Sequence, residues 1–257
     1  MLELIQFRYS PYNEKVRWAL DLKRVPHTRR SVLPGPHIRV VRKLTGRTMT
    51  PVLVADGVAI DGSAQIVEWL DQHYPEPRLI PERADERATA QEIIRLFDDD
   101  FAPRGRRAVL AALLRTPGYF ARVFGAGRGA LTQAFYSAIV PLAAPLVRKG
   151  NGITGPASVD DGIAAFTAGL DFVAQRSGAT GYLIAERFSV ADLTAASVLA
   201  VCVDPPDSPM TRPRPQAQPF ADFVAHFANH PGAEWVRAIY RRHRQVKNDF
   251  DGPSAYA

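Results

Sequence analysis

A serine stands at the junction between two predicted elements near the start of the chain. Ser10 lies between an apolar segment, 2–7, that predicts a strand and a segment, 12–23, whose apolar residues recur at helical spacing. The first turn of a helix carries unpaired backbone N–H groups and the positive end of the helix dipole. An anion beside the Ser10 hydroxyl would therefore be stabilised, and the junction predicts a site for a sulfur anion or a phosphate.

Two observations bear on what Ser10 does. Serine followed by proline at the first helical position is favoured for helix capping alone, so an N-cap is the simpler role. The only cysteine, Cys202, lies far along the chain at the end of an apolar helical pattern, where we expect a buried and unreactive thiol. A thiolate held beside Ser10 would therefore have to come from a bound cofactor.

The first 80 residues alternate strand and helix patterns. Predicted strands cover 2–7, 28–33, 51–54 and 58–60, and predicted helices cover 12–23, 37–44 and the residues from Ser63 onward. Asp56-Gly57, between the last two strands, favours a tight hairpin. This order of elements predicts an α/β, thioredoxin-like domain over residues 1–80.

Strand patterns disappear after about Pro81. Helical patterns cover 84–101, a variable middle from 104 to 147, and then 158–177, 190–202, 220–229 and 232–245. We therefore expect an all-helical second domain over residues 84–250. Segment 204–219 holds six prolines in 16 residues and predicts a surface loop between helices, with a proline-rich docking motif as the alternative.

Two further segments could meet Ser10. In a thioredoxin-like fold the Thr50-Pro51 bond is expected to be cis, which would turn the Thr50 backbone toward the helix end at Ser10, ready to pair with an extended peptide. An ordinary proline at the start of a strand is the alternative. Asp61-Gly62-Ser63 opens a helix, with Ser63 as the predicted N-cap and the free N–H groups as a carboxylate site. Together the three segments could bind the thiol, the middle peptide and one carboxylate of a tripeptide.

With these three segments in this order, the chain resembles the soluble glutathione S-transferase superfamily over nearly its whole length. SPYNEKVRWAL is similar to the serine-type active-site segment of the tau, zeta and theta-like classes, TPVL to the cis-proline strand, and DGSAQIVEWLDQHYP to the segment that binds the γ-glutamyl group. Phe188-Ser-Val-Ala-Asp-Leu193 is similar to the family's capping box and hydrophobic staple, and Ser189 with Asp192 has the matching chemistry.

The resemblance implies glutathione as the co-substrate and a role for each matching residue. Ser10 would supply the activating hydroxyl, Thr50 before Pro51 the backbone pairing, and Ser63 the γ-glutamyl carboxylate site. The family often has an acid directly before that serine, where this chain has Gly62, with the acid displaced to Asp61. A basic residue usually meets the glycine carboxylate of glutathione. His37, Arg39 and Arg42 are candidates, and Arg39 is favoured.

The middle of the helical domain predicts the pocket for a second substrate. A hydrogen bond from Ser10 and the helix end would favour a thiolate, the nucleophilic form of a thiol whose pKa is otherwise about 8.5. The electrophile would lie against the apolar middle segment, whose aromatic residues line a pocket or belong to the core. These are Phe120, Phe124, Phe135 and Tyr136.

Composition limits the other classes of function. Hydrophobic residues make up 46% and charged residues 23% of the 257, which indicates an ordinary globular protein, and the single cysteine excludes an intrachain disulfide. The formal net charge of +6 is dispersed, with no nucleic-acid motif, and no signal peptide or metal-ligand pattern is visible. The apolar window 130–147 contains Pro141 and Pro145 and is expected to be a buried or groove-lining helix. Contact of this window with a membrane interface is the alternative.

These features predict a cytoplasmic, homodimeric glutathione transferase that adds the thiolate of glutathione to a small hydrophobic electrophile. A second hypothesis is a protein of the same fold that carries apolar ligands or contacts a partner or membrane without catalysis. A third is a glutathione-dependent reductase, lyase or isomerase, which would share the same cofactor site. No metal and no nucleic acid are expected to take part.

Overall fold

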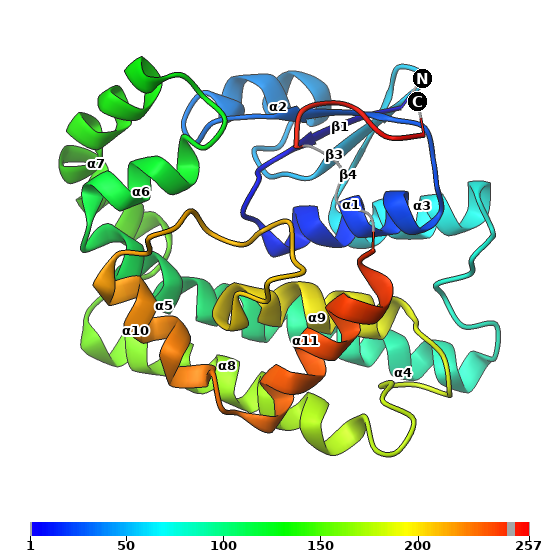
Figure 1. Cartoon of the computed structure of the whole chain (residues 1–257). Helices are drawn as coiled ribbons and strands as arrows, with labels where there is room; N and C mark the ends of the chain where they lie inside the picture. Colours follow the sequence, from blue (N-terminus) through cyan, green and yellow to red (C-terminus); the bar gives the residue numbers. More distant parts are fainter. Residues whose placement is uncertain (1, 246–249, 257) are drawn as a thin grey trace.

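The computed structural model describes residues 2–245 and 250–256 of the chain (Figure 1). The first domain follows the predicted order of elements. Its strands are β1 (Leu2–Gln6), β2 (Thr28–Ser31), β3 (Val52–Ala55) and β4 (Val58–Asp61), and its helices are α1 (Pro11–Leu22), α2 (His37–Thr45) and α3 (Ser63–His73). The α/β, thioredoxin-like prediction is confirmed.

The sheet is mixed and has the strand order β4-β3-β1-β2-β5, where β5 (Gly252–Pro253) comes from the chain after the helical domain. β1 pairs in parallel with β2, as expected for strands joined by a helical crossover, and antiparallel with β3. β3 and β4 form the hairpin predicted at Asp56-Gly57, where both residues have positive φ. These pairings bring the start of α1, the start of β3 and the start of α3 to one region of the domain.

The chain end adds a fifth strand that the sequence did not reveal. β5 (Gly252–Pro253) pairs antiparallel with β2, and the Ser254 N–H donates to the carbonyl of His27 at 2.8 Å. Asp251 accepts the Ser31 N–H and pairs with Arg8 at 2.6 Å. Figure 1 shows this last segment returning from the helical domain to the sheet edge beside the N-terminus. The expectation of no strand after about Pro81 is therefore wrong, because two residues suffice to extend a sheet edge.

The second domain is helical, as predicted. It comprises α4 (Ala84–Arg95), the π-helical segment η1 (Leu96–Phe101), α5 (Ala102–Leu114), α6 (Pro117–Phe124), α7 (Ala130–Gly150), α8 (Pro156–Arg176), α9 (Val190–Val203), α10 (Gln218–Phe227) and α11 (Pro231–His243). α9 is buried along its whole length, as expected for a helix that is apolar on every face. Its capping box is present as predicted: the Ser189 N–H and hydroxyl donate to Asp192 at 2.9 and 2.8 Å.

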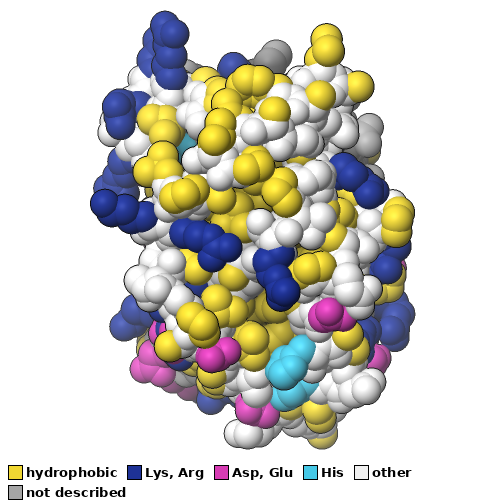
Figure 2. All heavy atoms as spheres, turned by 90° about the vertical axis from the view of Figure 1, so that its left-hand side faces the viewer, with side chains coloured by type: hydrophobic (Ala, Val, Ile, Leu, Met, Phe, Trp, Pro, Cys, Tyr) yellow, Lys and Arg dark blue, Asp and Glu magenta, His cyan; other side chains and the backbone are white. Residues whose placement is uncertain are grey.

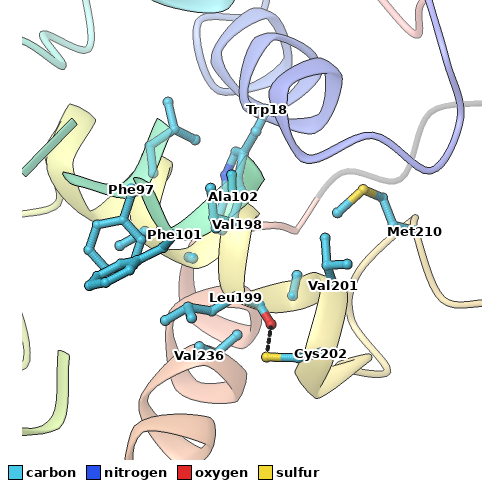
Figure 3. Close-up of a cluster of buried hydrophobic side chains, with 14 of the residues drawn as sticks. Trp18, Phe97, Phe101, Ala102, Val198, Leu199, Val201, Cys202, Met210 and Val236 are labelled. Carbon is cyan, nitrogen blue, oxygen red and sulfur yellow. Dashed lines mark hydrogen bonds between the residues drawn. The ribbon is translucent and has the colours of Figure 1, made fainter. Parts of the chain in front are cut away.

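The two domains share one core around α9. Trp18 of α1 packs there with Phe97, Val198 and Leu199, and its indole N–H donates to the carbonyl of His243 at 2.9 Å (Figure 3). Cys202 is fully buried in this core and donates to the carbonyl of Leu199 at 3.2 Å. Burial raises the pKa of the Cys202 thiol, so the expectation of an unreactive thiol agrees with its surroundings.

Buried charges also join α1 to the chain after α11. Arg244 donates to Glu14 and to Asp21, each at 2.8 Å, and all three side chains are at most 2% exposed. Arg17 pairs with Glu14 at 2.8 Å, and Arg29 pairs with Asp21 at 2.6 Å. Each buried carboxylate therefore has two guanidinium partners, which compensate the cost of removing it from water.

The expectation of a buried or groove-lining helix for segment 130–147 is met only in part. α7 runs through Pro141 and Pro145 as one 21-residue helix. By length and composition alone it could cross a membrane, and only 11% of its most apolar stretch is buried. Most of the helix is therefore not buried: one face packs on the protein through Tyr136 and Val140, Val147 lines a cleft between the two domains, and the other face is exposed.

Candidate active site

A cleft of about 380 Å³ lies between the two domains at the start of α1. The first domain contributes Ser10 and its neighbours together with Pro34, His37, Met49 and Thr50. The helical domain contributes the opposite wall, which is mainly apolar and includes Val109, Leu113, Phe120, Phe124 and Val198. The cleft thus joins a polar rim on the first domain to an apolar wall on the second.

Ser10 occupies the N-cap position of α1, but its hydroxyl does not cap the helix. The residue has extended backbone angles, φ −105° and ψ 128°, and the Glu14 N–H donates to the Ser10 carbonyl at 2.9 Å. No hydrogen bond joins the Ser10 side chain to the first turn, and Pro11 has no N–H to offer. The simple capping role is therefore not used, and the hydroxyl and the helix end are both available to an anion in the cleft.

Thr50 lies beside Ser10 in the cleft lining, and the Thr50-Pro51 bond is cis, as predicted. The Thr50 hydroxyl accepts a hydrogen bond from the Asn13 amide at 3.2 Å. Asn13 is fully buried in the first turn of α1, so this contact ties the start of α1 to the residue before Pro51. The structure therefore brings two of the predicted site residues, Ser10 and Thr50, to one wall.

Asp61, Gly62 and Ser63 lie next to this wall rather than in the cleft lining. The Gly62 N–H donates to the Pro51 carbonyl at 3.3 Å, which holds the start of α3 against the cis-proline strand. Gly62, not Ser63, is the N-cap: α3 begins at Ser63, so the predicted cap is displaced by one residue. Gly62 has φ +90°, a conformation that favours glycine at this position. Asp61 pairs with Arg47 at 3.3 Å on the surface.

Arg39 is not part of the cleft. Its side chain is exposed on the outer side of α2, in a shallow groove with Arg42 and Lys43. Of the three basic candidates, the structure places only His37 in the cleft lining, with its ring 4.7 Å from that of Phe7. Burial lowers the pKa of His37, so the ring is neutral near pH 7.

Two tyrosines flank Ser10, and neither is prepared to act as a phenolate. Burial raises the pKa of Tyr12 to about 12, and its hydroxyl donates to the Asp98 carbonyl at 2.7 Å. The pKa of Tyr9 is also raised, chiefly by burial. Both phenols are therefore protonated at neutral pH. The Tyr12 hydroxyl is engaged with Asp98, whereas the Ser10 hydroxyl is not used in a hydrogen bond to the first turn of α1.

The cleft contains two arginines that the sequence did not single out. Arg212 is 3% exposed, and its Nε and Nη1 make no hydrogen bond with the described parts of the chain. Its guanidinium lies over the rings of Tyr9 and Phe220, at 5.8 and 5.3 Å, and 3.6 Å from Asp204. Arg106 of α5 likewise has a buried Nε without a partner in the described chain. Two cationic side chains therefore belong to the cleft lining, and one of them lies beside the Asp204 carboxylate.

Arg212 also corrects the prediction for segment 204–219. The segment does connect α9 to α10, but it is not simply a surface loop. Ser208, Met210 and Arg212 are each at most 3% exposed, and Asp204 accepts from the Arg212 N–H at 3.2 Å and from Gln216 at 2.7 Å. The prolines shape a packed segment that delivers an arginine to the cleft, a role that composition alone does not indicate.

The predicted aromatic pocket is half right. Phe120 and Phe124 line the cleft and pack on each other at 4.4 Å. Phe135 is 59% exposed on the outer face of α7, and Tyr136 packs inward, with its hydroxyl donating to the Pro34 carbonyl at 2.7 Å. Within residues 2–245 and 250–256, no group of three His, Cys, Asp or Glu side chains could hold a metal ion.

Comparison of the sequence with known proteins finds a family match for the first domain and two named relatives. Residues 4–78 match the family model described as the glutathione S-transferase N-terminal domain. The first domain of the chain therefore belongs to the glutathione S-transferase N-terminal domain family. It is 28% identical to a maleylpyruvate isomerase of Ralstonia sp over 152 residues, which cover 58% of this chain and 72% of that protein. It is 31% identical to a probable maleylacetoacetate isomerase of Vibrio cholerae over 120 residues, covering 44% and 56%.

The whole fold also has a solved counterpart. A holo structure of maleyl pyruvate isomerase, described as a bacterial glutathione S-transferase of the zeta class, matches with a TM-score of 0.61 at 18% identity. The match covers 94% of this chain and 95% of that one. At this identity the likeness supports the fold, including the helical domain that lies beyond the family model.

Proposed function

We propose that the protein is a glutathione-dependent isomerase of a small unsaturated carboxylic acid. The observation that carries the proposal is the pair Arg106 and Arg212, two arginines in the lining of a mainly apolar cleft beside Ser10, each with a buried N–H group that makes no hydrogen bond with the described chain. Cationic side chains in a cleft lining favour a substrate with a carboxylate, which can accept hydrogen bonds that an entirely apolar electrophile cannot. The two isomerase relatives, both named for maleyl acids, support the same reading.

The residues around Ser10 fit glutathione. Its thiol sulfur would lie beside the Ser10 hydroxyl at the start of α1, its middle peptide along Thr50, and its γ-glutamyl end at Ser63 and Asp61. The chemistry that glutathione supplies when bound is reversible thiolate addition to a conjugated double bond. Ser10 donates a hydrogen bond that favours the ionised thiol, and the helix end adds a positive potential. Arg106 and Arg212 hold the substrate carboxylate and fix its orientation, and the apolar wall excludes water.

The geometry favours isomerisation over the conjugation of a hydrophobic electrophile that the sequence led us to expect. Conjugation needs the same thiolate site but no cationic donors on the electrophile wall. The two chemistries therefore differ in their dependence on Arg106. Measured with a maleyl acid and with an uncharged aryl halide, the ratio of the two activities separates them.

The direct test is cis-to-trans conversion of maleylpyruvate, followed by proton NMR with and without glutathione. We expect conversion only with glutathione, with no net consumption of it. The Ser10→Ala variant should lose roughly 10- to 100-fold in turnover at neutral pH, the loss expected for one hydrogen bond to a charged group. Its pH profile should move to higher pH because the thiol ionises less readily. Conjugation of the aryl halide without isomerisation would contradict the proposal, as would Ser10→Ala turnover equal to that of the wild type.

A further inference from the structure

The exposed face of α7 carries an apolar stripe. Its members recur at helical spacing on one side of the helix and are 88, 59, 38, 81 and 74% exposed: Leu131, Phe135, Ile139, Leu142 and Leu146. The opposite face, with Tyr136 and Val140, packs on the protein. A helix that is apolar on both faces is normally covered on both. The stripe is therefore a surface built to be covered by something outside this chain.

The expectation of dispersed charge is wrong, because Lys and Arg are separated from Asp and Glu along the chain. Segments 22–55 and 101–159 each hold eight Lys or Arg and no Asp or Glu, whereas the rest holds 16 Lys or Arg and 26 Asp or Glu. The two acid-free segments lie side by side: the Tyr136 hydroxyl donates to the Pro34 carbonyl at 2.7 Å, and Arg128 donates to Ser31 at 2.5 Å. The region around α2 and α7 is therefore positive, and the remainder of the molecule is negative.

The basic rim of the stripe consists of exposed side chains on α2 and at both ends of α7. They are Arg39, Arg42, Lys43, Arg128, Arg148 and Lys149. None of the six forms an ion pair with a carboxylate in the described parts of the chain. Figure 2 views the molecule from the α7 side: hydrophobic side chains spread over the upper part of this face, Lys and Arg lie around them, and Asp and Glu are confined to the lower part.

We propose that this face docks on an anionic lipid bilayer, with α7 lying in the plane of the membrane surface. An apolar helix face bordered by Lys and Arg is the chemistry of an interfacial helix, and basic residues beside it add attraction to acidic headgroups. A second copy fits less well, because a two-fold contact along α7 brings Arg128, Arg148 and Lys149 toward the same positive residues of the other copy. The inner face of α7 stays on the protein, so the helix lies on the bilayer rather than across it.

The test is co-sedimentation of the full-length protein with phosphatidylcholine vesicles, with and without phosphatidylglycerol. We expect binding only to the anionic vesicles and release in about 1 M salt, where the screening length falls to about 3 Å. Arg148→Gln/Lys149→Gln should weaken binding about 25-fold, at about fivefold per charge. The matched control is Arg241→Gln/Arg242→Gln, an exposed basic pair at the end of α11, which should bind as the wild type does.

A second pair of variants tests the stripe itself. Leu142→Ser/Leu146→Ser should weaken vesicle binding at least about tenfold. Val58→Ser, at a residue 66% exposed on β4, should leave binding unchanged. Leu142, Leu146 and Val58 do not line the cleft, so these variants should keep the wild-type turnover in solution. The membrane proposal can therefore be tested separately from the proposed reaction. Equal binding to neutral vesicles, no binding to either kind, or a dimer abolished by Leu142→Ser/Leu146→Ser without vesicle binding would each overturn it.

Discussion

The buried charges between α1 and the end of α11 give a sharp prediction for stability. In Arg244→Met the side chain keeps its approximate volume but loses two charge-assisted hydrogen bonds of 2.8 Å, to Glu14 and to Asp21. Hydrogen bonds to charged groups are worth about 1.5–3 kcal/mol each, and breaking a buried pair costs about 3–5 kcal/mol. Arg17 and Arg29 still compensate the two carboxylates. We therefore expect the free energy of unfolding to fall by about 3 kcal/mol.

Urea unfolding followed by tryptophan fluorescence measures this loss. Trp18 is a suitable probe because its indole N–H donates to the carbonyl of His243, next to Arg244. The control is Arg241→Met, whose side chain is 63% exposed and pairs loosely with Glu234 at 3.7 Å. Exposed pairs contribute at most about 1 kcal/mol, so this variant should remain close to the wild type. If Arg244→Met and Arg241→Met unfold within about 1 kcal/mol of each other, the buried network does not hold the two domains together.

Three further predictions follow from packing, burial and the cleft. Arg106→Met should raise KM for a maleyl acid roughly 10- to 100-fold in steady-state assays. The control Arg107→Met, which removes a contact with an acid on α8 outside the cleft, should leave KM nearly unchanged. Equal effects of the two variants would refute the carboxylate role of Arg106. Burial raises the pKa of Asp192 from 3.8 to about 6, so the folded state holds this proton more tightly than the unfolded state. The difference in unfolding free energy between the wild type and Asp192→Asn should therefore fall by up to about 3 kcal/mol as pH rises from below about 4 to about 7. A difference that grows with pH in urea titrations would contradict this. Gly232→Ala places a methyl group 2.2 Å from a backbone oxygen of α8 and should lower the unfolding free energy by about 1–3 kcal/mol. Gly118→Ala, in open space on α6, should raise the unfolding free energy by up to about 1 kcal/mol. A thermal unfolding temperature of Gly232→Ala equal to or above that of Gly118→Ala would be inconsistent with the packing.

Local signals explain what the sequence predicted correctly. Ser10 before Pro11, and Thr50 before Pro51, mark element boundaries through backbone chemistry that a proline imposes on its neighbours. The structure places Ser10 and Thr50 in one cleft and finds the Thr50-Pro51 bond cis. Ser189 and Asp192 form a capping box within four residues. The element boundaries and the capping box depend on residues close in sequence, whereas the cis bond and the meeting of Ser10 with Thr50 were expected from the thioredoxin-like order of elements.

Long-range contacts explain what the sequence did not predict. Arg212 reaches the cleft because Asp204 and the packing of Met210 fold a proline-rich segment inward, and no pattern within that segment shows this. The exposure of the α7 stripe did not follow from the expected buried or groove-lining helix, because composition does not say which face of an apolar helix the protein covers. One signal was present and overlooked: the absence of acidic residues from 22–55 and 101–159 marks a positive face. The homodimer and the cytoplasmic location stay predictions.

The central claim is that the start of α1, the residue before Pro51 and the start of α3 together bind glutathione. Calorimetric titration of the purified protein with glutathione tests it most directly, with Ser63→Ala measured beside the wild type. We predict saturable binding that Ser63→Ala weakens, because that serine stands where α3 begins against the cis-proline strand. No heat of binding at millimolar glutathione would contradict the account and favour a carrier of apolar ligands with the same fold.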